Sequence, residues 1–136
     1  MSSVVVLVDA NVLLDVATED PAWVDRSSAA LARVASESAL AINPIVYAEV
    51  SVGYASIEEV DAVFPADTFA RLSLPWAAAF LAGKCFVRYR HAGGVRRSPL
   101  PDFYIGAHAA IEGMPLLTRD PQRYRTYLPR LELITP

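Results

Sequence analysis

Acidic residues follow two apolar segments of this chain at the points where those segments end. Residues 4–8, "VVVLV", are typical of a strand buried on both faces, yet Asp9 follows them directly. A second apolar strand, 115–117, is followed by Thr118 and then by Asp120. Ligands of open parallel sheets bind at the carboxyl ends of the strands, so both carboxylates are expected at one edge.

Glu49 lies within the apolar stripe of a predicted helix. Its neighbours three and four residues away are all apolar or small: Ile45, Val46, Val52 and Gly53. The acid therefore points towards the core, where an ionised carboxylate is costly unless it is paired or bound to a metal. The alternative is a stripe rotated slightly around the helix, which leaves Glu49 at the edge of the solvent.

Asp102 stands in the first turn of another predicted helix, directly after Pro101. Acids are favoured at helix N-termini without any function, so position alone proves little. Gly106, Ala109 and Gly113 follow at helical spacing, however, and this strip of small residues predicts close packing of the helix.

Other polar residues are weaker candidates. His108 falls on a different face of the same helix and is expected to be a surface or packing histidine, and His91, in a basic segment, is no better as a base. Asp15 lies one helical turn beyond Asn11 without a motif partner and is expected to be a surface or capping acid.

If Asp9, Glu49, Asp102 and Asp120 meet, their repulsion requires compensation. Like charges about 6 Å apart cost about 3 kcal/mol per pair at an effective dielectric constant near 20. Either some acids are protonated or a cation binds, and oxygen ligands without cysteine or histidine favour Mg²⁺ or Mn²⁺. Hard cations held by carboxylates serve phosphoryl chemistry, which indicates hydrolysis of a phosphodiester or a phosphate.

Strands and helices alternate along the chain, which predicts an α/β fold: a three-layer α/β/α sandwich with a central, mainly parallel, twisted sheet. The length of 136 residues fits a single domain over 1–136. The predicted strands cover 4–8, 40–42, 69–74, 115–118 and 131–135, and the predicted helices cover 11–18, 22–38, 44–55, 57–64, 75–94 and 101–113. Residues 95–100 are expected to form a loop.

Composition excludes several classes of protein. Hydrophobic residues make up 54% of the chain, which argues against disorder, and no apolar run approaches the roughly 20 residues that a membrane span requires. The N-terminus lacks the features of a signal peptide, so a cytoplasmic protein without membrane contact is expected. The lone Cys85 cannot form an internal disulfide and is expected to be a small buried side chain.

Charge is divided unevenly between the two halves of the chain. Up to residue 83 there are three arginines and eleven acids, whereas from residue 84 onwards there are nine basic residues and four acids. Eight of those nine are arginines, which suit phosphate recognition, so an RNA footprint and an ordinary solvated surface are equally compatible with this pattern.

Four segments together resemble the acidic motifs of the PIN domain, and in particular the VapC-type ribonuclease toxins of type II toxin–antitoxin pairs. These segments are "VDANVLLD", "NPIVYAEV", "LPDFYIGAHAA" and "LLTRDPQRY", in the family's order and at its spacing along the whole chain. One mild departure is Ala10, where many members carry threonine.

The resemblance implies roles for individual residues. Asp9 and Asp102 would bind Mg²⁺, with Mn²⁺ as a substitute, and Asp120 would complete the metal site directly or through water. Glu49 would position or activate the attacking water. Asn11 would orient Asp9, and Thr118 would hold the last motif by hydrogen bonding.

The resemblance also implies the activity and the partners. The expected protein is a toxin and an endoribonuclease that hydrolyses RNA to 5′-phosphate and 3′-hydroxyl ends. It would form a homodimer and be neutralised by a small cognate antitoxin.

Three other functions compete with this one. A receiver domain has a similar size and fold but needs a lysine near its phosphorylated aspartate, and the single Lys84 lies inside a predicted helix. A PIN-like domain that binds RNA or protein without cutting is disfavoured because all four acids are present. A metal-dependent phosphatase acting on small molecules is harder to exclude, although the arginine-rich second half favours a polyanion.

Overall fold

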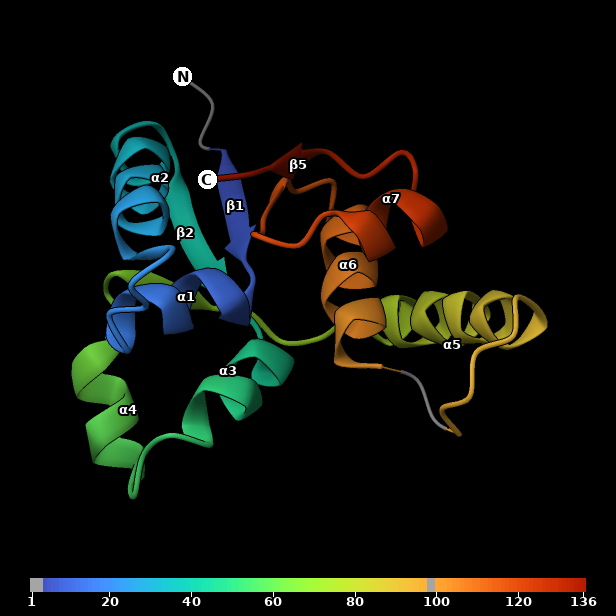
Figure 1. The fold of residues 1–136 in the computed structure, drawn as a ribbon, viewed down its shortest axis with the longest axis horizontal. Coiled ribbons are helices and arrows are strands. Elements are labelled where there is room, and N and C mark those ends of the chain that lie inside the picture. Colours follow the sequence, from blue (N-terminus) through green and yellow to red (C-terminus); the bar gives the residue numbers. More distant parts are fainter. Residues whose placement is uncertain (1–3, 98–99) are drawn as a thin grey trace.

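One parallel sheet organises the chain (Figure 1). The structure is a computed structural model that describes residues 4–97 and 100–136. Within these residues the strands are β1 (Val5–Val8), β2 (Ala39–Ile42), β3 (Phe69–Arg71), β4 (Leu116–Leu117) and β5 (Leu133–Ile134). They pair in the order β3-β2-β1-β4-β5, and every pairing is parallel. The predicted α/β class with a mainly parallel central sheet is confirmed, with β1 at its centre.

Helices cover both faces of this sheet. In the described residues they are α1 (Ala10–Ala17), α2 (Val24–Glu37), α3 (Pro44–Ser51), α4 (Ile57–Val63), α5 (Trp76–His91), α6 (Pro101–Glu112) and α7 (Gln122–Tyr127). Figure 1 shows α1 and α2 on one side of β1, and α6 and α7 on the other, which gives the predicted three layers. None of the described helices is long and apolar enough to cross a membrane.

The apolar run before Asp9 is buried over its last three residues, as expected, whereas Val4 is 43% exposed and lies outside β1. Val6, Leu7 and Val8 are each at most 1% exposed, since both faces of β1 are covered. The ladder between β1 and β4 continues past Val8, because the backbone N–H of Asp9 donates to the carbonyl of Leu117 at 2.9 Å. This pairing fixes Asp9 beside the carboxyl end of β4.

Three local predictions differ from the structure. The helix expected to reach residue 55 ends at Ser51, where the Ser51 hydroxyl bonds back to the Tyr47 carbonyl and Gly53, a poor helix former, follows. The strand expected over 69–74 ends at Arg71. Helix α7 was not predicted at all. Within the loop expected over 95–100, residues 98–99 lie outside the described residues.

Candidate active site

Asp9 is a buried carboxylate at the junction of β1 and α1. Its side chain is the N-cap of α1, where Oδ1 accepts from the N–H of Ala10 at 2.8 Å, and the residue is only 3% exposed. Burial raises its pKa to about 6, and the negative charge of Asp102 adds to the increase, whereas hydrogen bonds from Tyr124, Thr118 and Ala10 oppose it. The sequence thus places an acid where its charged form is costly.

Thr118 connects the end of β4 to Asp9 and Asn11. Its hydroxyl donates to Asp9 Oδ2 at 2.9 Å and accepts from the amide of Asn11 at 3.3 Å and from the backbone N–H of Asp120 at 3.2 Å. The N–H of Arg119 donates to Asn11 Oδ1 at 3.1 Å. Asn11 is therefore linked to Asp9 through Thr118 rather than directly, and it joins α1 to the loop after β4.

Glu49 extends from α3 towards the same region. Asn43 caps this helix by accepting from the N–H of Val46 at 2.9 Å, and Val46 and Val50 anchor it in the core. Glu49 itself is half-buried, but its Oε1 is enclosed and has no hydrogen-bond partner. Burial, together with the charges of Asp9 and Asp102, raises its pKa to about 7.

The stripe expected around Glu49 is only partly correct. Val46 is buried as expected, whereas Val52 is 87% exposed because α3 has ended before it. Glu49 thus lies at the margin of the buried stripe, between the core and the solvent. This position lets one carboxylate oxygen be enclosed while the rest of the side chain stays accessible.

Asp102 stands in the first turn of α6, after Pro101, as predicted. Its Oδ2 accepts from Arg123 Nη1 at 3.1 Å in an ion pair. The side chain of Asp102 is 34% exposed and that of Arg123 is 41% exposed. Burial raises the pKa of Asp102 and the charge of Asp120 adds to this, while the Arg123 guanidinium opposes it. Asp102 thus interacts electrostatically with all three other candidate acids.

Asp120 is the most accessible of the four acids. It is exposed in the loop before α7 and lines a cavity together with Asp102. Among residues 4–97 and 100–136, no three or more His, Cys, Asp or Glu side chains are grouped closely enough to hold a metal ion. The structure thus brings Asp9, Glu49 and Asp102 into mutual interaction and leaves Asp120 at the margin.

Tyr124 is a site residue that the sequence did not reveal. Its hydroxyl donates to Asp9 Oδ2 at 2.8 Å, and the residue is 1% exposed. The surrounding acids Asp9, Asp102 and Glu49, together with burial, raise the pKa of Tyr124 well above its usual value, so its proton is held. A signal was present, since Gly106 belongs to the small-residue strip: a Cβ there would lie 2.6–2.9 Å from Leu128 and Tyr124.

Asp15 is also placed differently from the prediction. It is 3% exposed, accepts from the Ser27 hydroxyl at 2.8 Å and pairs with Arg119 Nη1 at 3.2 Å, so the expectation of a surface or capping acid is wrong. The Arg119 guanidinium also lies 5.2 Å from the ring of Trp23. This buried pair anchors the segment between Thr118 and Asp120 to α1 and α2.

Neither histidine belongs to the acidic cluster. His108 is a packing residue, 1% exposed, whose Nδ1 lies 3.1 Å from the amide nitrogen of Asn43. Because Asn43 Oδ1 accepts from Val46, its amide nitrogen donates and the imidazole Nδ1 accepts, which requires a neutral ring. His91 is exposed at the end of α5, and Cys85 is buried as expected.

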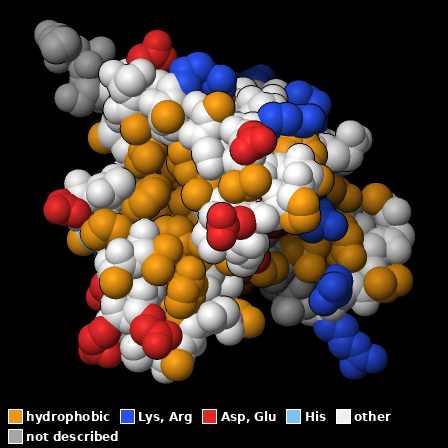
Figure 2. Space-filling view, turned by 60° about the vertical axis from the view of Figure 1, so that its left-hand side comes forward, with side chains coloured by type: hydrophobic (Ala, Val, Ile, Leu, Met, Phe, Trp, Pro, Cys, Tyr) orange, Lys and Arg blue, Asp and Glu red, His pale blue; other side chains and the backbone are white. Residues whose placement is uncertain are grey.

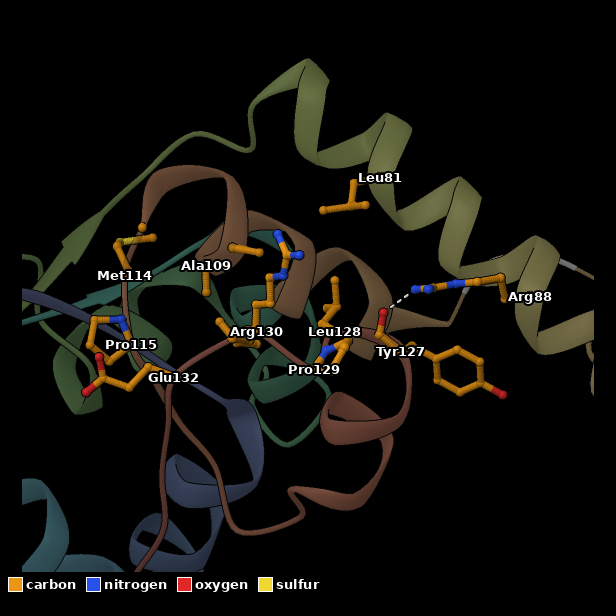
Figure 3. A pocket seen from close by; sticks show the side chains of 13 residues that line it. Leu81, Arg88, Ala109, Met114, Pro115, Tyr127, Leu128, Pro129, Arg130 and Glu132 are labelled. Atoms are coloured by element: carbon orange, nitrogen blue, oxygen red, sulfur yellow. Dashed lines mark hydrogen bonds between the residues drawn. The ribbon is translucent and has the colours of Figure 1, made fainter.

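Two cavities flank α7 on different sides. The one in Figure 3, about 460 Å³, lies between α5, α6 and the C-terminal segment, and none of the four candidate acids lines it. The other, about 500 Å³, has Asp102 and Asp120 in its wall. Only the second cavity is continuous with the candidate site.

Charge is also separated in space. The acid-rich first half of the chain, including α4, lies opposite the arginine-rich α5 to α7 (Figure 1). On the face seen in Figure 2, most basic side chains lie on the upper and right-hand sides, and several acidic ones lie at the lower left. Arg123, which pairs with Asp102, brings positive charge to the edge of the acidic cluster.

Several solved structures share this fold. A VapBC2 complex of Rickettsia felis bound to a DNA fragment from its promoter is 19% identical, with a TM-score of 0.74 over 97% of this chain and 98% of that chain. VapBC-1 of Haemophilus influenzae is 17% identical, with a TM-score of 0.72 over 96% and 97%. A toxin–antitoxin complex of Klebsiella pneumoniae is 23% identical, with a TM-score of 0.70 over 99% and 98%.

Sequence comparison narrows the assignment from a fold to a family. No curated protein shows significant similarity to the chain. The family model of the PIN domain matches residues 6–128, which include Asp9, Glu49, Asp102, Asp120 and Tyr124. The chain therefore belongs to the PIN domain family.

Proposed function

We propose that this protein is a metal-dependent endoribonuclease and the toxin component of a VapBC-type toxin–antitoxin pair. One observation carries the proposal: Asp9, Glu49 and Asp102 interact at the carboxyl end of a parallel sheet, and the enclosed Oε1 of Glu49 lacks a partner. Buried unpaired carboxylates are costly, so such a cluster is retained where a cation or a proton compensates it.

The residues present fit Mg²⁺, with Mn²⁺ as a substitute. The donor atoms are carboxylate oxygens, which hard cations prefer. The pKa values of Asp9 and Glu49 are raised mainly by burial and further by neighbouring carboxylate charge, and a bound cation would offset both effects. Mg²⁺ is commonly held by one or two carboxylates together with waters and substrate phosphates. Two interacting acids, Asp9 and Asp102, are therefore sufficient without a larger group of protein ligands.

The four acids would have different roles in hydrolysis. Asp9 and Asp102 would hold the ion, and Asp120, at the cavity edge, would complete its surroundings. When bound, the ion lowers the pKa of water and offsets charge on the phosphate. Glu49, with a pKa of about 7, is suited to accept the proton of the attacking water at neutral pH. Attack of this water on phosphorus would break the P–O3′ bond and leave a 5′-phosphate and a 3′-hydroxyl.

Thr118, Asn11 and Tyr124 act on Asp9 rather than on RNA. Thr118 and Tyr124 both donate to Asp9 Oδ2, which fixes the orientation of the carboxylate. Among the described residues, Oδ1 accepts from the N–H of Ala10 alone. Asn11 steadies Thr118 in turn. We therefore assign Thr118, Asn11 and Tyr124 as positioning residues.

The partners follow from the structural relatives. The similar structures from Rickettsia felis and Haemophilus influenzae are VapBC complexes, which supports a cognate antitoxin for this chain as well. A homodimer and a cytoplasmic location belong to the same proposal. If a short reading frame adjoins its gene, coexpression tests this: the toxin function predicts that the two products copurify and that RNA cleavage is lost in the complex.

A non-catalytic, RNA-binding PIN domain is the second candidate. It is favoured by the ion pair between Arg123 and Asp102 and by the absence of a ready group of three metal-binding side chains within the described residues. A phosphatase acting on small substrates would use the same acids. These candidates differ in what the protein does to a phosphodiester bond.

The deciding experiment incubates purified protein with 5′-labelled single-stranded RNA and Mg²⁺ or Mn²⁺. Wild type should cleave, whereas Asp9→Asn and Asp102→Asn should each lose most activity. Asp25→Asn, which changes an exposed acid on α2, is the matched control and should cleave like wild type. Equal cleavage by all four proteins rejects the assignment, and hydrolysis of p-nitrophenyl phosphate without RNA cleavage supports the phosphatase.

A further inference from the structure

The cavity beside Asp102 and Asp120 has the size and position of a substrate subsite. Its volume is about 500 Å³, within the range of about 300–1,000 Å³ usual for small-molecule pockets. Tyr89 of α5 and Gln122, Arg123, Thr126 and Tyr127 of the α7 region form the rest of its wall. Any group bound there lies next to two of the four acids.

Aromatic rings form one side of this cavity. Tyr89 and Tyr127 are half-buried, with ring centroids 6.4 Å apart, and Figure 3 shows the Tyr127 ring extending away from the apolar cavity on the other side of α7. The buried ring of Phe103 contacts both rings edge-on, with its centroid 5.8 Å from that of Tyr89 and 5.3 Å from that of Tyr127. Because Phe103 supports them from the core, the two tyrosine rings are held in place before any ligand binds.

Gly94 contributes to this arrangement. A Cβ at Gly94 would lie 2.2 Å from the ring of Tyr89, so a side chain there would displace the ring. The Tyr89 hydroxyl lies 3.5 Å from the backbone N–H of Arg96, at the limit of a hydrogen bond. The segment after α5 thus accommodates the ring.

The polar side chains of the cavity differ in whether they already have partners or are free to bind a ligand. Arg123 pairs with Asp102, and the Thr126 hydroxyl donates to the backbone carbonyl of Gln122 at 3.0 Å. The Gln122 side-chain amide is exposed and makes no hydrogen bond within the described part of the chain. It offers one acceptor and two donors, a combination that can pair with the edge of a nucleobase.

We propose that this cavity is a nucleobase subsite that binds one unstacked base of single-stranded RNA next to the scissile phosphate. The base would stack on Tyr127, with the Tyr89 ring beside it at 65° to the Tyr127 ring, and pair with Gln122, while its phosphate extends towards Asp102 and the Arg123 guanidinium. Aromatic stacking accepts any base, so the Gln122 amide supplies the preference among bases. This inference rests on the proposed ribonuclease function, and it names the part of the site that selects the nucleotide.

The test measures binding in EDTA, where no cleavage occurs. Fluorescein-labelled hexamers of A, C or U are titrated with wild type, Tyr127→Leu, Tyr127→Phe and Gln122→Glu, and affinity is read by fluorescence anisotropy. Removing one stacking ring should weaken binding by about tenfold, and Tyr127→Phe, which keeps the ring, should recover most of that loss. Gln122→Glu removes the amide donors and should change the order of affinities among the hexamers.

Tyr54→Leu is the matched control, because Tyr54 is also half-buried and contacts Phe64 edge-on, with ring centroids 6.2 Å apart, but does not line this cavity. It should bind RNA like wild type, and thermal melting shows whether each variant is folded. If Tyr127→Leu does not fold, Gln122→Glu on the surface decides the question. An RNA duplex should bind more weakly than the single strands, because its bases stay stacked.

Failure of the subsite and failure of the ribonuclease function are distinguishable. No measurable binding of the hexamers by wild type, or unchanged affinity in Tyr127→Leu and unchanged base order in Gln122→Glu, overturns the subsite even if the protein cleaves RNA. Conversely, binding that depends on Tyr127 and Gln122 without cleavage under any metal condition supports the subsite and rejects catalysis. Equal affinity for duplex and single strands also overturns it, since that outcome indicates contacts with the backbone alone.

Discussion

Asp9 receives hydrogen bonds from three different parts of the chain, and these bonds decide how its charge is tolerated. Ala10 belongs to its own helix, Thr118 to the end of β4 and Tyr124 to α7. Each bond favours the ionised carboxylate, while burial disfavours it, and burial is the larger effect because the pKa is raised to about 6. The balance between these effects leaves the acid mostly ionised at neutral pH, about one pH unit above its pKa.

Removing the Tyr124 hydroxyl should disturb that balance. Hydrogen bonds to charged groups contribute about 1.5–3 kcal/mol, so in Tyr124→Phe we expect the pKa of Asp9 to rise above about 6 and RNA cleavage at neutral pH to fall about tenfold. Carbon-detected NMR titration of the Asp9 carboxyl measures the first effect. Tyr104→Phe is the control, since the Tyr104 hydroxyl makes no hydrogen bond within the described residues. An unchanged Asp9 titration in Tyr124→Phe would contradict this role.

Replacing Arg123 should strengthen the binding of a metal ion at Asp102. The Arg123 guanidinium occupies Asp102 Oδ2 and repels other cations, so Arg123→Gln should bind Mg²⁺ more tightly. The pair is partly exposed and pairs of this kind contribute about 1 kcal/mol or less, so the gain should be at most about fivefold. Calorimetric titration with Mg²⁺ measures it, with Arg125→Gln on the same helix as the control. Weaker binding in Arg123→Gln would show that Arg123 supports the site instead.

At the scale of elements, the sequence predicts those that repeat a clear pattern. Strand β1, the helix start at Asn43 and Pro44, and the end of α6 at Gly113, with φ of 66°, all follow from buried runs, capping residues and glycine. Helix α7 does not, because it has six residues, no side-chain cap and a polar sequence, "QRYRTY". Its stability comes from tertiary contacts, which single-sequence patterns do not contain.

Part of the site depends on α7, which the sequence pattern does not predict. The four acids are recognisable in the sequence because each follows a strand, lies in an apolar stripe or begins a helix. Tyr124 and Arg123 carry no such mark, and their contacts with Asp9 and Asp102 join residues that are 115 and 21 positions apart. Asp15 was misplaced for the same reason, since its partner Arg119 lies at the other end of the chain.

The contact between α6 and α7 gives a prediction about packing. An alanine at Gly106 would place its Cβ 2.6–2.9 Å from Leu128 and Tyr124, so Gly106→Ala should shift α7 and move the Tyr124 hydroxyl away from Asp9. Overpacking of this kind typically costs about 1–3 kcal/mol, and RNA cleavage should fall as well.

Urea denaturation and the RNA assay measure the two effects of Gly106→Ala. Gly83→Ala is the matched control, because nothing lies within 4 Å of a Cβ there, and the change in mid-helix should stabilise α5 by up to about 1 kcal/mol. If Gly106→Ala behaves like Gly83→Ala, close packing at Gly106 does not position Tyr124.

At the scale of the whole molecule, the acidic cluster links stability to pH. The pKa of Asp9 is raised from 3.8 to about 6 and that of Glu49 from 4.5 to about 7. A carboxyl with a raised pKa stabilises the fold while protonated, so this contribution is present below the unfolded values and is lost as the pH rises through about 6 to 7.

The metal-free protein should therefore lose stability between about pH 4 and pH 7, with Asp9 alone contributing about 3 kcal/mol. Urea denaturation in EDTA at several pH values measures the slope, and Asp9→Asn should flatten it. Addition of Mg²⁺ should restore stability mainly at the higher pH, where the carboxylates are ionised. A flat profile, or equal stabilisation by Mg²⁺ at both ends of the range, would contradict this linkage.

The central place of β1 in the sheet has a consequence for the order in which the chain folds during synthesis. β1 pairs with β2 about a quarter of the way along the chain, but its other neighbour is β4, where Leu7 is paired with Leu116. A nascent chain that ends before β4 already contains Asp9, Glu49 and Asp102, yet it lacks the strand that holds Asp9 and the hydroxyls of Thr118 and Tyr124. Fragments truncated before residue 116 should therefore carry three of the four acids without forming the site, which is assembled only after β4 and α7 have been synthesised.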